Sequence, residues 1–438
     1  MQAAESRPPN QILVLVDDLG RDWVGAYGSS HPTPNLDRLA AEGVRFETAW
    51  FTPVCTPTRV ALLTGQRPCR SGWTVHYDVP RWGGAGLIPE NYPTLGLWMR
   101  RAGYVTAIAG KWQINDLRRE PDIMRRHGFD EHCLWTGVES GNPASERRYW
   151  DPFLQINGER RTHGGEFGPD VVQRFVFDFI RQHRDRPFFL YYPMINVHAP
   201  NEPTPLHRVT PPEGEAALYA GMVDYTDRQV GDLLRWLEAL GLTENTIVYF
   251  AGDNGSSTGG TLDGVSMPAG KGTRLSDLGV HVPLLVRAPG RVRSGIVSRR
   301  LVEVTDLLPT LAEFAGLKLP ADAARDGRSL VSELTSGASV APRPWIVTQY
   351  GAERAVRDQR YYLDNRGGFF DLVADPQQKQ PLRWDATVES AAAHQRLRAA
   401  LASVPADAGP PFPEYAQAER RLQEHQAANR ARRLESSH

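Results

Sequence analysis

The chain contains the stretch Cys55-Thr56-Pro57-Thr58-Arg59, which continues as Val60-Ala61-Leu62-Leu63-Thr64-Gly65. Thr56 is a residue type that caps helices, Pro57 suits a first helical turn, and the apolar residues beyond keep a helical spacing. The stretch therefore predicts a helix with Cys55 at its N-terminus, where the helix dipole favours an anion or a nucleophile. Arg59, one turn further on, can reach the same point. A site for a tetrahedral oxyanion and a buried structural cysteine are both compatible with these residues.

Two apolar runs of strand length end in acidic residues. Residues 12–16 are followed by Asp17-Asp18, and residues 246–251 are followed by Gly252-Asp253-Asn254. Continuous apolar runs are typical of central strands covered on both faces, and open α/β sheets bind ligands at the carboxyl ends of their strands. A cation would relieve the repulsion between the paired aspartates, although a solvated turn would also explain them.

Lys111 and His198 also follow predicted strands. Lys111 comes just after the run 103–109, and His198 follows the run 188–192. A lone histidine is more often structural than catalytic, but its position at a strand's carboxyl end places it with the aspartates. We therefore expect Asp17-Asp18, Lys111, His198 and Asp253-Asn254 to meet at one edge of one sheet.

The remaining pattern predicts an α/β fold with a large, mostly parallel or mixed β-sheet between layers of helices. Helices are expected at 34–43, 94–102, 170–183, 215–240 and 305–315, with a further strand at 282–286. Residues 114–168 are polar and weakly periodic, which predicts irregular loops on the substrate side.

A smaller C-terminal α+β unit is predicted after a Gly-, Ser- and Pro-rich linker at about 325–344. Four short runs at 345–350, 353–357, 360–364 and 368–372 predict an antiparallel sheet, and helices are expected at 389–401 and 416–432. We accordingly divide the chain into a catalytic domain at 1–335 and a C-terminal subdomain at 336–438.

Composition excludes several classes of protein. The 438 residues carry a net charge of −1, which argues against attraction to nucleic acid or a membrane surface by bulk charge. Three cysteines provide no disulfide framework, and no stretch is long and apolar enough for a transmembrane span. The first nine residues lack the apolar core of a signal peptide, so we expect a cytoplasmic protein, or a periplasmic or secreted one whose signal was removed.

The predicted edge residues suggest a hard cation. Three carboxylates and an amide oxygen, from Asp17, Asp18, Asp253 and Asn254, suit Ca²⁺, with Mg²⁺ as a second option. A thiolate is a poor ligand for such an ion, so a site that includes Cys55 would require an oxygen species in place of its sulfur.

The sequence resembles the type I sulfatases of the alkaline-phosphatase-like superfamily. The stretch from Cys55 to Gly65 is similar to the sulfatase signature. Further similar motifs follow in the family's order: Val16-Asp17-Asp18, Thr33-Pro34-Asn35-Leu36-Asp37, Gly110-Lys111-Trp112, His198-Ala199-Pro200, Gly252-Asp253-Asn254-Gly255, Lys271, and Gly368-Phe369-Phe370-Asp371-Leu372 with Asp375-Pro376.

The resemblance implies hydrolysis of a sulfate monoester. In the family the signature cysteine, here Cys55, is oxidised to formylglycine by a maturation enzyme that recognises residues 55–59 before folding. Its hydrate attacks sulfur, and collapse of the sulfated form releases sulfate and restores the aldehyde. Asp17, Asp18, Asp253, Asn254 and the modified Cys55 would bind Ca²⁺, and Asp253 would also help to deprotonate the attacking hydroxyl.

Further roles follow from the same resemblance. Arg59 would hold the diol, while Lys111 and Lys271 would bind the sulfuryl and leaving oxygens. His198 would protonate the leaving oxygen. If His198 is the only titrating histidine, His198→Ala should abolish the acid–base limb of the pH–rate profile.

One motif departs from the family pattern. Where the family usually has Gly-Lys-Trp-His, this chain has Gln113, which can hydrogen-bond the diol or a sulfate oxygen but cannot take up a proton at neutral pH. Two alternatives stay open: a phosphodiester or phosphonate monoester hydrolase of the same superfamily, and a catalytically silent binding protein with unmodified Cys55.

Aromatic and basic residues in the predicted loops favour a sulfated carbohydrate as substrate, because rings can stack on sugar faces and cations can hold neighbouring sulfates. Packing of surface loops by their own side chains is an equal alternative for each of them. These residues are Trp73, His76, Tyr77, Trp82, Arg118, Arg119, Tyr149, Trp150 and His163.

Overall fold

The computed structural model describes residues 7–272, 275–321, 323, 326–337 and 341–405, with the single residues 420, 424 and 427. The helix expected at 416–432 falls almost entirely outside the described residues. Among the helices that are described, none combines the length and the apolar character needed to span a membrane.

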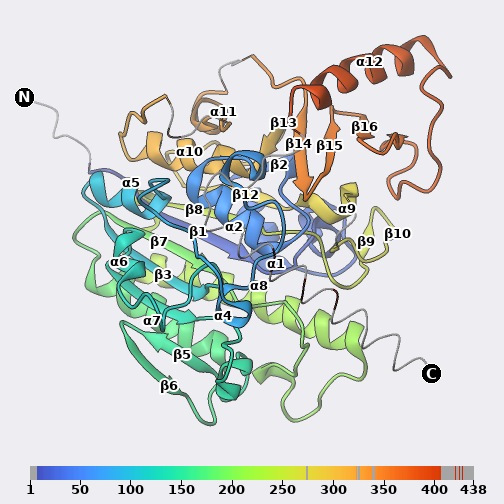
Figure 1. The fold of residues 1–438 in the computed structure, drawn as a ribbon. Helices are drawn as coiled ribbons and strands as arrows, with labels where there is room; N and C mark the ends of the chain where they lie inside the picture. The colour runs from blue at the N-terminus through green and yellow to red at the C-terminus, as the bar shows by residue number, and fades with distance from the viewer. Residues whose placement is uncertain are drawn as a thin grey trace, which may run out of the picture.

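A mixed sheet of eleven described strands forms the centre of the molecule (Figure 1). Five of them run parallel in the order β8-β1-β7-β3-β4. Their bounds are Thr246–Gly252 (β8), Asn10–Val16 (β1), Phe188–Pro193 (β7), Val105–Lys111 (β3) and Glu131–Trp135 (β4).

Mixed strands flank this parallel centre. On the β8 side, β12 is antiparallel to β8 and pairs with β2, which also contacts β11 and β13. On the other side, the hairpin β5-β6 continues from β4. Their bounds are Val44–Trp50 (β2), His281–Val282 (β11), Leu284–Arg287 (β12), Ile296–Glu303 (β13), Phe153–Ile156 (β5) and Glu159–Thr162 (β6).

Both faces of the sheet are buried, which explains the unbroken apolar run of β1. Leu13 and Leu15 pack into one core, whereas Ile12, Val14 and Val16 pack into the other. A strand covered on two sides needs no polar face, so its sequence lacks the alternation of a half-exposed strand.

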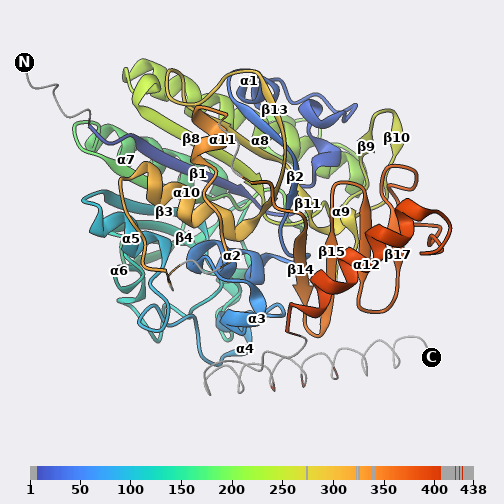
Figure 2. The same ribbon diagram turned by 90° about the horizontal axis from the view of Figure 1, so that it is seen from above.

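Helices form a layer over each core, and Figure 2 shows the two layers on either side of the sheet. One layer contains α2 (Cys55–Thr64), α5 (Leu95–Arg101), α6 (Ile123–Arg126), α10 (Leu307–Phe314) and α11 (Val331–Thr335). The opposite layer contains α1 (Pro34–Ala41), α7 (Gly168–Gln182) and α8 (Glu215–Ala239). Short helices α3 (Pro68–Ser71), α4 (Val79–Trp82) and α9 (Asp277–Val280) and the small hairpin of β9 (Thr261–Leu262) and β10 (Val265–Ser266) lie in the connections.

The prediction of irregular loops at 114–168 is wrong for part of that segment. It contributes α6 and three strands, β4, β5 and β6, that extend the main sheet. The sequence conceals them because β4 and β5 have only five and four residues and β6 is polar. An exposed edge strand such as β6 has little apolar surface to bury, and strands as short as β4 and β5 are too brief to show a clear period.

The C-terminal antiparallel sheet is confirmed, in the order β14-β15-β16-β17. Its strands span Ile346–Tyr350, Glu353–Arg357, Tyr361–Asp364 and Phe369–Asp371, and α12 (Val388–Ala402) packs on it (Figure 1). Buried side chains of this sheet pack in one cluster with side chains of the main sheet. In addition, Arg357 Nη1 of β15 lies 2.7 Å from Asp277 Oδ1 of α9. The boundary between residues 335 and 336 stays a prediction.

Candidate active site

The carboxyl ends of the parallel strands bring together the polar residues predicted to meet there. Asp17 and Asp18 follow β1, Asp253 and Asn254 follow β8, Lys111 is the last residue of β3, and His198 lies beyond the end of β7. Because all four strands are parallel, these residues lie at one edge of the sheet.

Gly110, the residue before Lys111, allows β3 to approach the end of β7 closely. Its φ of +129° is uncommon for other residue types, and a Cβ here would lie 1.8 Å from the carbonyl oxygen of Pro193. Only glycine fits this contact, so it holds the end of β3 against the segment that follows β7.

The predicted helix after position 55 is confirmed as α2, with Cys55 as its first residue and Gly65 in the left-handed conformation that ends it. The expected capping role of Thr56 is wrong, because Val54 is the N-cap and, within the part of the chain that the structure describes, no side chain caps the helix. Thr56 Oγ1 instead accepts a hydrogen bond from the Tyr77 backbone N–H at 3.1 Å, since Thr56 already lies inside the first turn.

Three buried carboxylates pair with three cations. Lys111 Nζ lies 2.7 Å from Asp17 Oδ2, and Lys271 Nζ lies 2.5 Å from Asp18 Oδ2. Arg59 Nη2 lies 2.8 Å from Asp253 Oδ2. The three pairs cancel in charge, as buried ions must to offset their loss of hydration.

Burial and the neighbouring cations shift these carboxyl groups in different directions. Burial raises the pKa of Asp17, but Lys111, His198 and Arg59 together outweigh it and leave that pKa below its usual range. Burial also raises the pKa of Asp18, but the charges of His198 and Lys271 outweigh it and lower that pKa. Burial, and next the charge of Asp17, raise the pKa of Asp253 well above its usual range. A positive charge among these groups would therefore favour the ionised form of Asp253.

Among the described residues, two buried oxygens in this cluster accept no hydrogen bond: Asp17 Oδ1, which has Arg59 Nη2 at 3.6 Å, and Asn254 Oδ1. The Asn254 amide nitrogen donates to Asp18 Oδ1 at 2.8 Å, which leaves its own oxygen without a partner. Possible ligand atoms of Asp17, Cys55 and Asp253 lie within 4.8 Å of one another. Unpartnered buried oxygens are costly, so this donor set fits a hard divalent cation.

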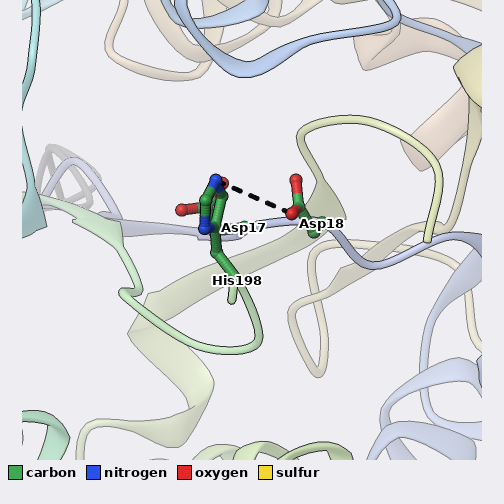
Figure 3. A group of neighbouring side chains, drawn as sticks. All are labelled: Asp17, Asp18 and His198. Atoms are coloured by element: carbon green, nitrogen blue, oxygen red, sulfur yellow. Dashed lines mark ion pairs between the residues drawn. The ribbon is translucent and has the colours of Figure 1, made fainter. Parts of the chain in front are cut away.

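His198 lies beside the aspartate pair (Figure 3). Its Nε2 is 3.8 Å from Asp18 Oδ2, and its Nδ1 is 2.7 Å from the carbonyl oxygen of Ala199. Burial lowers the pKa of His198 to about 3 against the opposing charges of Asp18 and Asp17. The second contact of Nδ1 is Arg148 Nη2, at 3.1 Å.

Sequence reasoning missed Arg148, which comes from the segment read as irregular loops. Its side chain is 7% exposed, and its guanidinium lies 4.6 Å from the centre of the Trp135 ring. Among the described residues, no ion pair involves Arg148. An arginine in a polar 55-residue segment gives no sequence signal by itself, because only the fold brings it to His198.

Cys55 has two further polar neighbours. His76 Nδ1 lies 3.6 Å from its sulfur, and Gln113 Oε1 lies 4.0 Å from it. Gln113 therefore reaches the predicted position beside residue 55. His76 was expected only in a surrounding loop, but it contacts the sulfur itself.

Most of the other candidate loop residues have partners within the chain, and they range from buried to exposed. Trp73, Tyr77 and Tyr149 are at most 2% exposed, and Tyr149 donates to the carbonyl oxygens of Ile195 and His198. Trp82 contacts the His76 ring edge-on, and Trp150 donates to the carbonyl of Pro203. Arg118 and Arg119 pair with Asp116, and His163 lies near Glu166.

Residues 9–317 match the family model described as Sulfatase, which covers more than half of the chain. The chain belongs to the sulfatase family. It is an enzyme of the class that hydrolyses sulfate esters, and its fold is that of the alkaline-phosphatase-like superfamily, as the sequence resemblance predicted.

Similar curated sulfatases cover most of the chain. The dog N-acetylgalactosamine-6-sulfatase is 33% identical in an alignment of 371 positions that covers 76% of this chain and 67% of that protein. Bovine arylsulfatase A is 34% identical in an alignment of 415 positions that covers 85% of this chain and 78% of that protein.

Solved sulfatase structures show the same fold. The crystal structure of Ps i-CgsB has a TM-score of 0.78 at 24% identity and covers 93% of this chain and 95% of its own. BT4656 in complex with D-glucosamine-2-N,6-O-disulfate has a TM-score of 0.72 at 20% identity, with 93% and 99% covered.

Proposed function

We propose that this sulfatase uses a formylglycine at position 55 and a Ca²⁺ ion to remove sulfate from a sulfated carbohydrate. The observation that carries the proposal is the buried Cys55 at the start of α2, beside a carboxylate oxygen of Asp17 and near an amide oxygen of Asn254 that accept no hydrogen bond among the described residues. A sulfur atom among hard oxygen ligands is mismatched, and its replacement by oxygen makes the donor set uniform.

Asp17, Asp18, Asp253 and Asn254 would hold the ion. A bound divalent cation supplies positive charge that polarises the sulfate ester. Because Lys111, Lys271 and Arg59 already balance the three carboxylates, the ion would leave the site with a net positive charge that favours an anionic sulfate group. Mg²⁺ would satisfy the same charge argument with fewer ligands.

The hydrated formylglycine supplies a hydroxyl nucleophile for attack on sulfur. Asp253 would accept the proton of that hydroxyl, and Arg59 orients Asp253 through its 2.8 Å contact. Lys111 and Lys271 offer N–H donors to the sulfate oxygens. His198, whose Nε2 faces the cluster, would supply the proton that the leaving sugar oxygen needs once the negative charge of a bound sulfate ester raises its pKa from the low value that burial imposes.

The maturation enzyme would act before this chain folds. Cys55 and Arg59 are each 3% exposed, so the folded protein hides the recognition stretch 55–59. The side-chain conversion is therefore expected on the unfolded chain.

A carbohydrate substrate is supported by the relatives and by one residue of this chain. One relative is named for the sulfate on N-acetylgalactosamine, and one structural neighbour holds a disulfated glucosamine. Arg148, a buried cation stacked on Trp135 beside His198, would suit a second anionic group on the sugar.

The test combines mass spectrometry with a substrate comparison. Protein produced with a formylglycine-generating enzyme should show an aldehyde or its hydrate in the residue-55 peptide, and should cleave aryl and sugar sulfates. Cys55→Ala should be folded and inactive. An unmodified thiol in the wild type would support the silent binding protein, and faster cleavage of aryl phosphate diesters would support the phosphodiesterase alternative.

A further inference from the structure

Arg148 is a buried cation that has no carboxylate partner within the described ranges of the chain. The residue is 7% exposed, and among the described residues its guanidinium group makes one polar contact, from Nη2 to Nδ1 of His198 at 3.1 Å. Its Nε is buried and donates no hydrogen bond to them. Burial raises the pKa of Glu202 although the charge of Arg148 opposes the shift, but these two described side chains form no ion pair. The three carboxylates of the cluster already have other cationic partners.

Two aromatic rings hold the guanidinium group in place. Its Cζ lies 4.6 Å from the centre of the Trp135 ring and 5.6 Å from that of the Tyr149 ring. Such rings attract a cation but carry no net charge, so they do not neutralise it. A buried charge without an opposite charge is costly, and a ligand that brings an anion recovers this cost through charge-assisted hydrogen bonds to the guanidinium N–H groups.

The position of Arg148 differs from that of the scissile sulfate. One ring nitrogen of His198, Nε2, lies 3.8 Å from Asp18 Oδ2 in the carboxylate cluster, whereas the other, Nδ1, contacts Arg148 (Figure 3 shows His198 beside the aspartates). In the proposed function the sulfate is held by Lys111 and Lys271 of that cluster, and Nε2 protonates the leaving oxygen. Arg148 is thus placed on the side of the sugar that carries the leaving oxygen.

We propose that Arg148 binds a second anionic group, a carboxylate or a further sulfate, on the same sugar ring that loses its sulfate. The inference rests on the proposed function and makes its substrate a doubly anionic sugar. Because His198 contacts Arg148 through one nitrogen and the leaving oxygen through the other, Arg148 Nη2 lies within about 8 Å of that oxygen. Substituents of a single pyranose ring span such a distance, so both anions belong to one ring.

A matched pair of aryl sulfates tests the inference whatever the natural sugar is. 4-Nitrophenyl sulfate has no second anion, whereas 3-carboxy-4-nitrophenyl sulfate carries a carboxylate that is too far from the leaving oxygen to pass it a proton. The wild type should have the higher kcat/KM on the carboxylated probe. Arg148→Met should lower this preference about 10- to 100-fold, as expected for loss of a charge-assisted hydrogen-bonded pair. Any disturbance of His198 slows both probes, so it cancels in the ratio.

Two pairs of sugar sulfates distinguish the two kinds of anion. N-sulfoglucosamine 6-sulfate against N-acetylglucosamine 6-sulfate tests a second sulfate, and glucuronic acid 2-sulfate against glucose 2-sulfate tests a carboxylate. The preference for the doubly anionic member should again fall in Arg148→Met.

Two further variants separate the guanidinium group from its surroundings. Arg147→Met removes the neighbouring arginine, whose side chain is 64% exposed and pairs with Asp151, and it should retain the wild-type ratio. Arg148→Lys retains the charge but loses the planar fork, so its ratio should lie between those of wild type and Arg148→Met.

The same ratio in Arg148→Met as in wild type would overturn the inference. So would a wild type without preference in the aryl pair, a measurement that does not depend on any variant being folded. In both cases cleavage of 4-nitrophenyl sulfate would leave the proposed function standing. Failure of the formylglycine-containing wild type to cleave any of these sulfate esters would overturn both.

Discussion

Replacing Lys111 with methionine should destabilise the protein, and the loss should depend on calcium. Lys111 Nζ lies 2.7 Å from Asp17 Oδ2, and the two side chains are 1% and 0% exposed. Removing one partner of a buried ion pair costs about 3–5 kcal/mol, and Asp17 would then keep the longer 3.6 Å contact of its Oδ1 with Arg59 Nη2. Methionine has nearly the same shape as lysine, so lost packing contributes little.

The expected shift in melting temperature follows from the size of the chain. Unfolding entropy is about 2.1 cal/mol/K per residue, so a chain of 438 residues gives roughly 0.9 kcal/mol/K and a fall in Tm of about 3–6 °C. In Ca²⁺ the bound ion would compensate Asp17, so the difference between variant and wild type should be smaller than in EDTA.

Calorimetry of both proteins in EDTA and in excess Ca²⁺ measures this. Lys318→Met, at an exposed position, is the matched control and should leave Tm nearly unchanged. A Lys111→Met protein as stable as this control in EDTA would refute the ion-pair argument. An equal loss in both buffers would refute the placement of Ca²⁺ beside Asp17.

Three further changes have defined outcomes. Burial raises the pKa of Asp22 to about 6 although Ser256 donates to it, so the folded state binds the proton more tightly than the unfolded chain and stability falls as pH rises from about 4 through 6. Asp22→Asn should remove this loss of stability, which is worth about 3 kcal/mol. Urea titrations at pH 5 and 7.5 measure the change in unfolding free energy between the two pH values, and a change as large in the variant as in wild type would contradict the reasoning. His198→Ala should slow hydrolysis of sugar sulfates about 100-fold but affect nitrophenyl sulfate much less, because a good leaving group needs no proton; equal effects in kcat assays would count against His198 as the acid. Gly110→Ala should lower Tm and activity together, since its Cβ would collide with the Pro193 carbonyl, and a variant with normal Tm would contradict that clash.

Local sequence patterns predicted most of the central fold because burial leaves a direct trace in composition. β1 and β8 are buried on both faces, so they appear as apolar runs with polar residues directly after them. The same patterns did not predict β4, β5 and β6, because these strands are short or exposed and bury too little apolar surface to leave a pattern. The sequence located α2 but assigned Thr56 the wrong role, because cap geometry depends on which residue begins the helix.

By itself, the sequence determined the order of the motifs, the strand ends that carry Asp17, Asp18, Lys111 and Asp253, and the conflict between sulfur and hard oxygen ligands at position 55. Each of these follows from residue type and near neighbours. Only the tertiary structure placed His76 and Gln113 on the side chain of Cys55, because the three residues lie in separate segments whose approach depends on how α2, β3 and the α3–α4 connection pack. Cys55 marks the site in the sequence, but its partners are decided by packing between segments distant along the chain.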